Sequence, residues 1–177
     1  MRIIAGTKRG MKLLGPKTDV SRPITDRVKE SLFSVLYKYD LPNNAVAADL
    51  FCGVGSLALE ALSRGAEFVT FVEQDPKVIS VLNKNIEKAG FVKASKVIRG
   101  NAFKLGAPNA PEEQNVQSNS ALSGLMDLLG GQVAGDGVVV VRTEHKVTLL
   151  EQYGEFRVVE RRRWGTMAVT ILQKINV

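Results

Sequence analysis

Two glycines and two carboxylates in the first half of the chain have the spacing of a nucleotide-type binding site. The segment DLFCGVGSLALE places Gly53 and Gly55 between an expected strand and an expected helix, where the backbone can approach a ligand closely. Glu73 follows about 20 residues later, at the end of the next expected strand, where a carboxylate accepts hydrogen bonds from ribose hydroxyls. Asp49 precedes the first glycine by four residues. These residues predict a site for a nucleoside-bearing cofactor.

The glycines alone fit two cofactors. Gly53 to Ala58 satisfies the loose pattern G-x-G-x-x-G/A, which does not choose between NAD and S-adenosylmethionine. Asp49 favours S-adenosylmethionine, because its carboxylate could bond the amino acid part of that cofactor but would repel the phosphates of a dinucleotide. Asn101, after the third expected strand, is a candidate partner for the adenine amino group, with a simple turn asparagine as the alternative. A tight turn without a ligand is the remaining interpretation of the glycines.

Strand and helix patterns alternate from residue 45 onward, and they are the elements that must position these residues. Expected strands at 45–49, 66–75 and 94–103 are separated by expected helices at 56–65 and 76–90. This βαβαβ order predicts a parallel sheet with right-handed crossovers. Pro76 at a helix start and glycines at the helix ends support the boundaries.

The second half of the chain continues the pattern differently. We expect a helix over 120–132, a buried strand over 136–145, a short helix, and an antiparallel pair over 155–174 that turns near Trp164 and Gly165. The predicted fold class is α/β, with a doubly wound, mainly parallel Rossmann-like sheet and a C-terminal antiparallel hairpin.

A basic arm precedes the alternating elements. RIIAGTKRGMKLLGP has short apolar runs on either side of residues 7–10, which predicts a β-hairpin, and a helix follows with Thr25 placed to cap it. Residues 1–40 hold nine basic and four acidic side chains, a net charge of +5 out of +6 for the whole chain. Such an arm suits a polyanion, although an ordinary solvated surface is the alternative.

Length and composition restrict the class of protein. With 177 residues, 45% apolar and 24% charged, the chain can bury one core, and no apolar run is long enough to span a membrane. The only cysteine, Cys52, has no partner for an internal disulfide, so a reducing compartment, the cytoplasm, is expected. We divide the chain into a basic hairpin extension, residues 1–24, and a catalytic domain, residues 25–177.

Four segments together resemble the bacterial small-subunit ribosomal RNA guanine-N2 methyltransferases. They are RIIAGTKRGMKLLGP, SRPITDRVKESLFSVL, DLFCGVGSLALEALSRGA and FVEQDPKVISVLNKNIE. The resemblance covers most of residues 1–103 and resumes over 119–174, and the Arg-Pro-x-Thr-Asp-Arg segment at 22–27 is its most diagnostic part. It implies a class I methyltransferase domain that uses S-adenosylmethionine to methylate the exocyclic N2 amine of a guanine.

The resemblance also implies roles for individual residues and partners. The cofactor would be held by Asp49, Phe51, Gly53, Gly55, Glu73 and Asn101. Ribosomal RNA, naked or in an assembling small subunit, would be gripped by Lys8, Arg9, Lys12, Arg22, Thr25 and Arg27. No metal and no membrane take part in such a reaction, and a monomer is expected. Methyl transfer to nitrogen needs no nucleophile from the protein, so Cys52 is expected to pack beside the cofactor.

One part of the chain departs from this family. The fourth strand of such a sheet should end in Asp-Pro-Pro-Tyr or a close variant, whose carboxyl and carbonyl groups accept the guanine amine hydrogens. KLGAPNAPEEQNVQS, residues 104–118, has no strand pattern, and its nearest echo is residues 109–112. The catalytic residues are therefore unknown.

Two explanations follow from that departure. In the first, a strand with its catalytic turn belongs between about Ala107 and Asn119 and is missing from this sequence. We favour this explanation, because a protein that had lost the central strand would leave two unpaired strand edges inside its core, which is very costly. In the second, the protein is a catalytically silent module that binds the cofactor and RNA. A nicotinamide-dependent oxidoreductase is the third interpretation of the chain.

Overall fold

The computed structural model describes residues 1–15, 24–103, 105 and 118–175. The chain divides into two compact units, Met1–Ala102 and Phe103–Val177. The first unit holds the basic arm, the glycine loop and the alternating elements, and the second holds the antiparallel strands. Among the described residues, no helix is long and apolar enough to cross a membrane.

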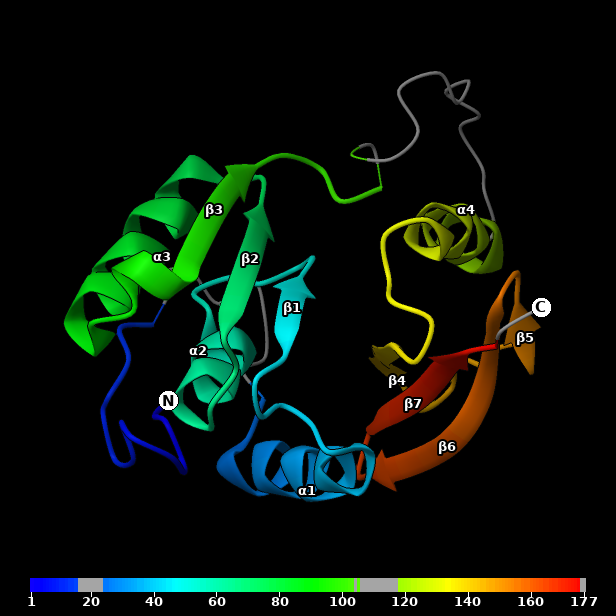
Figure 1. The fold of residues 1–177 in the computed structure, drawn as a ribbon, viewed down its shortest axis with the longest axis horizontal. Helices are drawn as coiled ribbons and strands as arrows, with labels where there is room; N and C mark the ends of the chain where they lie inside the picture. Colours follow the sequence, from blue (N-terminus) through cyan, green and yellow to red (C-terminus); the bar gives the residue numbers. More distant parts are fainter. Residues whose placement is uncertain (16–23, 104, 106–117, 176–177) are drawn as a thin grey trace. The chain divides into compact units, whose positions relative to one another are not determined.

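The first unit is built on a three-stranded parallel sheet. Its order is β1 (Val46–Asp49), β2 (Phe68–Glu73) and β3 (Ser95–Arg99), as the alternating pattern predicts (Figure 1). The crossovers are the helices α2 (Ser56–Ser63) and α3 (Pro76–Ala89). Because the strands are parallel, their carboxyl ends meet at one edge of the sheet. That edge carries the predicted cofactor residues.

Local chemistry sets the helix boundaries. In α3 the Asp75 carboxylate accepts a hydrogen bond from Lys77 N at 2.7 Å, Pro76 occupies the first turn, and Gly90 ends the helix with φ +74°. The helix α1 (Asp26–Leu36) begins after Thr25, whose hydroxyl accepts from the backbone of the first turn. Two single 3-10 turns, η1 (Tyr37–Tyr39) and η2 (Val92–Ala94), complete the unit.

The N-terminal arm forms the predicted hairpin. Ile3 N donates to Met11 O at 2.9 Å, and Arg2 and Lys12 form an antiparallel bridge. Two apolar side chains of the arm pack inside the unit: Ile3 is fully buried and Leu13 is 7% exposed, whereas Leu14 is 44% exposed. The hairpin is therefore packed into the first unit, while the tip and the basic side chains remain at its surface.

The second unit is an antiparallel sheet with one helix. The strands β4 (Val138–Glu144), β7 (Met167–Lys174), β6 (Phe156–Trp164) and β5 (Gln152–Tyr153) lie in that order, and α4 (Ser118–Gly130) precedes them. The predicted antiparallel pair is β6 and β7, which turn at Gly165 with φ +60°. Its core is formed by apolar side chains from the helix and the sheet: Met126, Leu149, Tyr153, Phe156 and Leu172.

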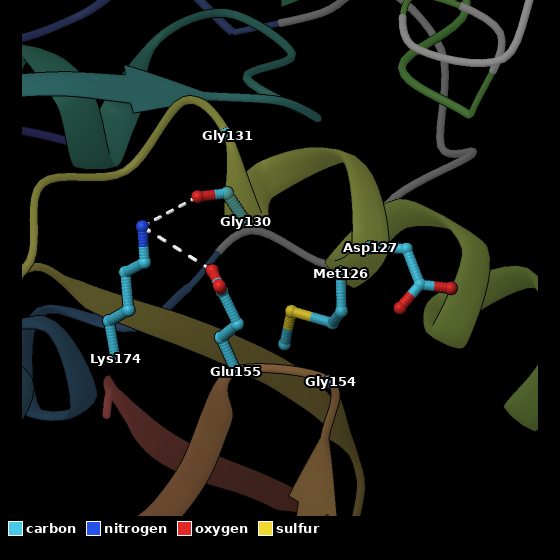
Figure 2. A pocket seen from close by; sticks show the side chains of 7 residues that line it. All are labelled: Met126, Asp127, Gly130, Gly131, Gly154, Glu155 and Lys174. Carbon is cyan, nitrogen blue, oxygen red and sulfur yellow. Dashed lines mark hydrogen bonds and ion pairs between the residues drawn. The ribbon is translucent and has the colours of Figure 1, made fainter. Parts of the chain in front are cut away.

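A lysine at the end of β7 joins the sheet to the end of α4. Lys174 Nζ donates to Gly130 O at 2.6 Å and to Val133 O at 3.0 Å, and lies 3.4 Å from Glu155 Oε2. Figure 2 shows this lysine reaching the carboxyl end of the helix beside a shallow pocket that Met126 also lines. The cation meets carbonyls that a helix end leaves unpaired, so these contacts stabilise the unit and need no ligand.

Two expectations for the second unit are wrong. No short helix lies between β4 and the antiparallel pair in this described stretch; the chain instead turns and forms β5, because Leu150 N donates to the Tyr153 hydroxyl at 3.0 Å and Tyr153 pairs with Phe156. The strand β4 was expected to be buried, yet Val140 is 37% exposed. Among the described strands, β4 pairs with β7 alone.

The segment that departs from the family lies mostly outside the described residues. Residues 104 and 106–117 belong to it, so the proposed additional strand stays a prediction. Residues 118 and 119 are already the start of α4. Within its own sheet β1 is an edge strand, and Val46 is 73% exposed.

Candidate functional site

The predicted cofactor loop is held against the end of β2 by Glu73. Cys52 N donates to Val72 O at 3.2 Å, and Gly53 N donates to Glu73 Oε2 at 3.1 Å. The other carboxylate oxygen, Oε1, accepts from Gln74 N at 2.8 Å and from Asp75 N at 3.0 Å. The structure thus joins Gly53 and Glu73, two residues that the spacing predicted to share a site.

The Glu73 carboxylate retains capacity for a ligand. An ionised carboxylate has about four acceptor positions, and the three backbone donors leave room at Oε2, which accepts one bond from the described residues. A ribose hydroxyl could donate there. The Ser56 hydroxyl, at the start of α2, is buried and has no hydrogen-bond partner among the described residues. The loop therefore has polar groups that suit an additional partner.

The two glycines of the loop have different surroundings. Both have a positive φ, +53° at Gly53 and +88° at Gly55. A Cβ added at Gly53 would meet nothing within 4 Å, whereas one at Gly55 would lie 2.6 Å from Leu82 Cδ1 and 3.3 Å from Phe71 Cε1. Gly53 faces open space that a ligand can enter, and Gly55 lets α2 pack closely on α3 and β2.

This difference predicts unequal effects of two alanine substitutions. Gly53→Ala should lower the free energy of unfolding by about 1–2 kcal/mol, the usual cost of left-handed backbone at a non-glycine residue. Gly55→Ala adds overpacking against the fully buried Leu82 and should lower it by about 2–4 kcal/mol. Urea unfolding of the two variants measures both, and equal losses would contradict the packing role of Gly55.

The other predicted cofactor residues lie around the same edge. Asp49 is the last residue of β1, and Phe51, two residues on, is 61% exposed. Gly100 N donates to Glu73 O at 3.0 Å, which keeps the chain beside β2 just before Asn101. The carboxyl edge therefore brings together the loop, Asp49, Glu73 and the residue that precedes Asn101. Cofactor contacts of the six predicted residues stay predictions.

Cys52 is placed as a packing residue. Its side chain is 7% exposed, and burial raises the pKa of its thiol, with the charges of Asp49 and Glu73 raising it further. Sγ lies 3.6 Å from Gly53 O. A protonated, buried thiol is a poor nucleophile.

We therefore expect Cys52 to resist alkylation. At pH 8 iodoacetamide should modify it at least about tenfold more slowly in the native protein than in urea, because the thiolate is the reactive form and the native site disfavours it. Mass spectrometry of timed samples measures both rates. Rapid modification of the native protein would show that the thiol is accessible and ionised.

A buried ion network joins the N-terminal arm to the helices α1 and α2. Glu60, on α2, is fully buried; its Oε2 accepts from Ile4 N at 2.7 Å and its Oε1 from Ala5 N at 2.9 Å. Lys29 Nζ lies 3.6 Å from Glu60 Oε2, and Arg64 Nε donates to Oε1 at 2.8 Å. Sequence reasoning missed this network. The available signal was a lone carboxylate inside the otherwise apolar helix SLALEALS.

The predicted RNA-binding residues fall into two groups. Arg9, Lys12 and Arg27 are exposed. Lys8 is partly buried, with Nζ 5.8 Å from the centroid of the Phe91 ring. Thr25 is exposed and caps α1, a structural role that leaves its RNA contact a prediction. Arg22 lies outside the described residues.

Known proteins share both the sequence and the fold of this chain. A Bacillus subtilis (strain 168) protein named "Putative rRNA methyltransferase YlbH" is 30% identical over 184 residues, covering 98% of this chain and 99% of that protein. The "Ribosomal RNA small subunit methyltransferase D" of Escherichia coli (strain K12) is 43% identical over 105 residues, and this match covers 58% of the chain and 50% of the relative. A solved structure described as "Putative methyltransferase yhhF from Escherichia coli" superposes with a TM-score of 0.78 at 28% identity, covering 99% and 98% of the two chains.

These findings define the class and then the family. The parallel sheet, with a glycine loop after β1 and an acidic residue at the end of β2, is the Rossmann-like α/β fold of the class I methyltransferases. Residues 1–173 match the family described as "Conserved hypothetical protein 95", and the chain belongs to this family. The resemblance to the small-subunit ribosomal RNA methyltransferases is confirmed by the relatives.

Proposed function

We propose that this protein transfers a methyl group from S-adenosylmethionine to ribosomal RNA, at the exocyclic N2 amine of a guanine in the small subunit. The observation that carries the proposal is the glycine loop held by Glu73 at the carboxyl edge of a methyltransferase-type sheet. The relatives named as small-subunit ribosomal RNA methyltransferases support the substrate class. The N2 position rests on the family resemblance of the sequence.

The loop residues fit this cofactor in three respects. Glu73 Oε2 has an acceptor position for a ribose hydroxyl. Gly53 leaves open space beside the loop, and Phe51 exposes an aromatic ring next to it. Asp49, the last residue of β1, carries a carboxylate that would attract the positively charged amino group of the methionine part and would repel a dinucleotide pyrophosphate. When bound, S-adenosylmethionine supplies a methyl group on a sulfonium centre and leaves as the neutral thioether S-adenosylhomocysteine.

The protein's own residues have two tasks in this reaction. The loop and Glu73 fix the cofactor at the edge of the sheet, which turns an encounter between two ligands into a positioned pair. The basic side chains of the arm bind phosphates and hold the RNA against the domain. In the family this chain resembles, the group that orients the guanine amine belongs to the Asp-Pro-Pro-Tyr turn after the fourth strand; residues 104–118 do not contain that turn, so the group that would do this here stays unknown.

Calorimetry with two ligands tests the cofactor assignment. S-adenosylhomocysteine should bind the full chain, whereas NAD should bind at least about 100-fold more weakly because of the unfavourable charge of Asp49 near phosphate. Tight NAD binding without S-adenosylhomocysteine binding would overturn the proposal in favour of an oxidoreductase.

Glu73 provides the matched variant for the same experiment. Glu73→Gln keeps the size of the side chain but removes a charged acceptor, and the loss of one hydrogen bond to a charged group weakens binding by about 10- to 100-fold. Glu67→Gln, an exposed position before β2, is the control and should bind as the natural chain does. Equal affinity in the two variants would remove Glu73 from the cofactor site.

A silent binding module is the second candidate function. It is favoured by one observation, the lack of an Asp-Pro-Pro-Tyr segment or close variant anywhere in the chain. Such a protein would bind S-adenosylhomocysteine and RNA with the same residues. Methyl transfer itself separates the two candidates.

A further inference from the structure

A single buried asparagine contacts both the arm and the cofactor loop. Asn85, on α3, is fully buried, and its Oδ1 accepts from Leu14 N at 2.8 Å. Its Nδ2 donates to Leu14 O at 3.1 Å and to Val54 O at 3.0 Å. Both amide hydrogens and the amide oxygen are therefore engaged, with the arm on one side and the residue between the two loop glycines on the other.

A buried lysine makes a second connection of the same kind. Lys29 Nζ donates to Arg2 O at 2.7 Å and to Ser56 O at 3.4 Å. Arg2 lies at the start of the arm and Ser56 directly follows the loop. The arm is thus bonded near both of its ends to side chains that also hold the loop on either side of Gly55.

The loop between these connections has little freedom to move independently. A Cβ at Gly55 would lie 2.6 Å from Leu82 Cδ1, on the same helix one turn before Asn85. Gly55 N also donates to Cys52 O at 2.9 Å. A shift of the loop would therefore strain the Asn85 bond to Val54, and through the same amide group the bonds to Leu14.

We propose that Asn85 is a positioning residue that couples the cofactor loop to the RNA-binding arm. The inference rests on the proposed function, because it assigns a cofactor to the loop and RNA to the arm. A ligand that orders the loop stabilises the arm through Asn85, and by thermodynamic linkage RNA on the arm strengthens cofactor binding by the same factor. Coupling of this kind favours binding of both substrates together before methyl transfer.

Amide hydrogen exchange of the natural chain tests the coupling without RNA. The probe is S-adenosylhomocysteine at saturation, and the reporters are the amides of Gly53 in the loop and of Leu14 in the arm. We expect exchange at both to slow, at Leu14 by about fivefold, the lower range of typical allosteric coupling. Slowing at Gly53 with an unchanged rate at Leu14 would overturn the coupling and leave the cofactor assignment intact. No slowing at either amide and no heat of binding would remove the proposed function and the coupling together.

Two variants identify the residue that carries the effect. Asn85→Asp keeps the shape and the acceptor for Leu14 N but removes the donors to Val54 O and to Leu14 O, so S-adenosylhomocysteine should slow Leu14 exchange by less than about twofold. Ser63→Ala is the control, because Ser63 Oγ accepts from Lys8 N at 2.9 Å and donates to Ala5 O at 2.6 Å, so its loss loosens the arm. Within the part of the chain that the structure describes, that hydroxyl bonds only to the arm and not to the loop.

The comparison separates coupling from loss of structure. Ser63→Ala should exchange faster at the arm yet keep the ligand-induced slowing at Leu14, whereas Asn85→Asp should lose the slowing while Gly53 still responds. If both variants keep the slowing, Asn85 does not carry the coupling. If Asn85→Asp does not fold, the natural chain's response at Leu14 still decides whether the arm and the loop are coupled.

Discussion

Glu60→Gln is expected to lower the free energy of unfolding by about 3–5 kcal/mol, the range found when one partner of a buried ion pair is removed. Glu60 and Lys29 both have fully buried side chains, so the lysine charge would lose its counter-ion in a place that water does not reach. Glutamine keeps one carbonyl acceptor, but the second oxygen, which Ile4 N or Ala5 N needs, is replaced by a donor. Urea unfolding at neutral pH measures the loss.

The same variant should show a characteristic dependence on pH. Burial lowers the pKa of Lys29 below its ordinary value of 10.5, and the Glu60 charge partly offsets this, so the pKa falls further without Glu60. A lysine with a lowered folded pKa destabilises the fold fully below that pKa, and the penalty disappears as pH rises to the unfolded value. The deficit of Glu60→Gln should therefore shrink between pH 7 and pH 10.

An exposed glutamate provides the control for this experiment. Glu67→Gln removes the same charge at the surface and should change the free energy of unfolding by less than about 0.5 kcal/mol at either pH. A loss at Glu60 as small as that at Glu67 would show that the buried network does not stabilise the arm. A deficit that is independent of pH would show that Lys29 is not the group responsible.

Replacing Lys8, Arg9 and Lys12 together by alanine should weaken RNA binding by about 100-fold near 0.1 M salt. Each phosphate contact contributes about 0.7–0.9 to the slope of log affinity against log salt, so the slope should fall by about 2–3. The arm itself should stay in place, because its backbone is held by the side chains of Lys88 and Glu60. The three substituted side chains take no part in those hydrogen bonds. Filter binding to small-subunit ribosomal RNA over a salt series measures both quantities.

The matched control removes the same charge elsewhere in the first unit. Lys77, Lys84 and Lys96 are exposed and lie away from the arm in the sequence. Their triple alanine variant should lose less than about tenfold in RNA affinity, and S-adenosylhomocysteine should bind both triple variants equally. Equal losses of RNA affinity would mean that net charge, and not the arm, determines binding.

The alternating elements of the first unit could be predicted because local chemistry determines them. The helix α3 illustrates this: Asp75 caps it, Pro76 starts it and Gly90 ends it, and all three signals are readable in the sequence. The spacing of Gly53 and Glu73 likewise predicted residues that the structure joins by a hydrogen bond. These inferences need only neighbours in the sequence or the regular order of a βαβ unit.

The contacts that were missed join residues far apart in the chain. Asn85 and Leu14 are separated by 71 residues, and Glu60 and Ile4 by 56. Each polar residue lies on an otherwise apolar helix surface, which hints at a buried partner but does not identify it. The expected short helix after β4 failed for a different reason: Tyr153 pairs with Phe156 across a tight turn, and this strand pairing replaces the helix that the local pattern suggested.

Transfer of a labelled methyl group to small-subunit ribosomal RNA tests the central claim most directly. The full chain is incubated with labelled S-adenosylmethionine and either naked RNA or assembling small subunits, and the RNA is digested to nucleosides for mass spectrometry. We expect the label in N2-methylguanosine, either with both RNA substrates or with the assembling particle alone. Label in another nucleoside would contradict the guanine N2 assignment, and no label despite S-adenosylhomocysteine and RNA binding would show the protein to be a silent binding module.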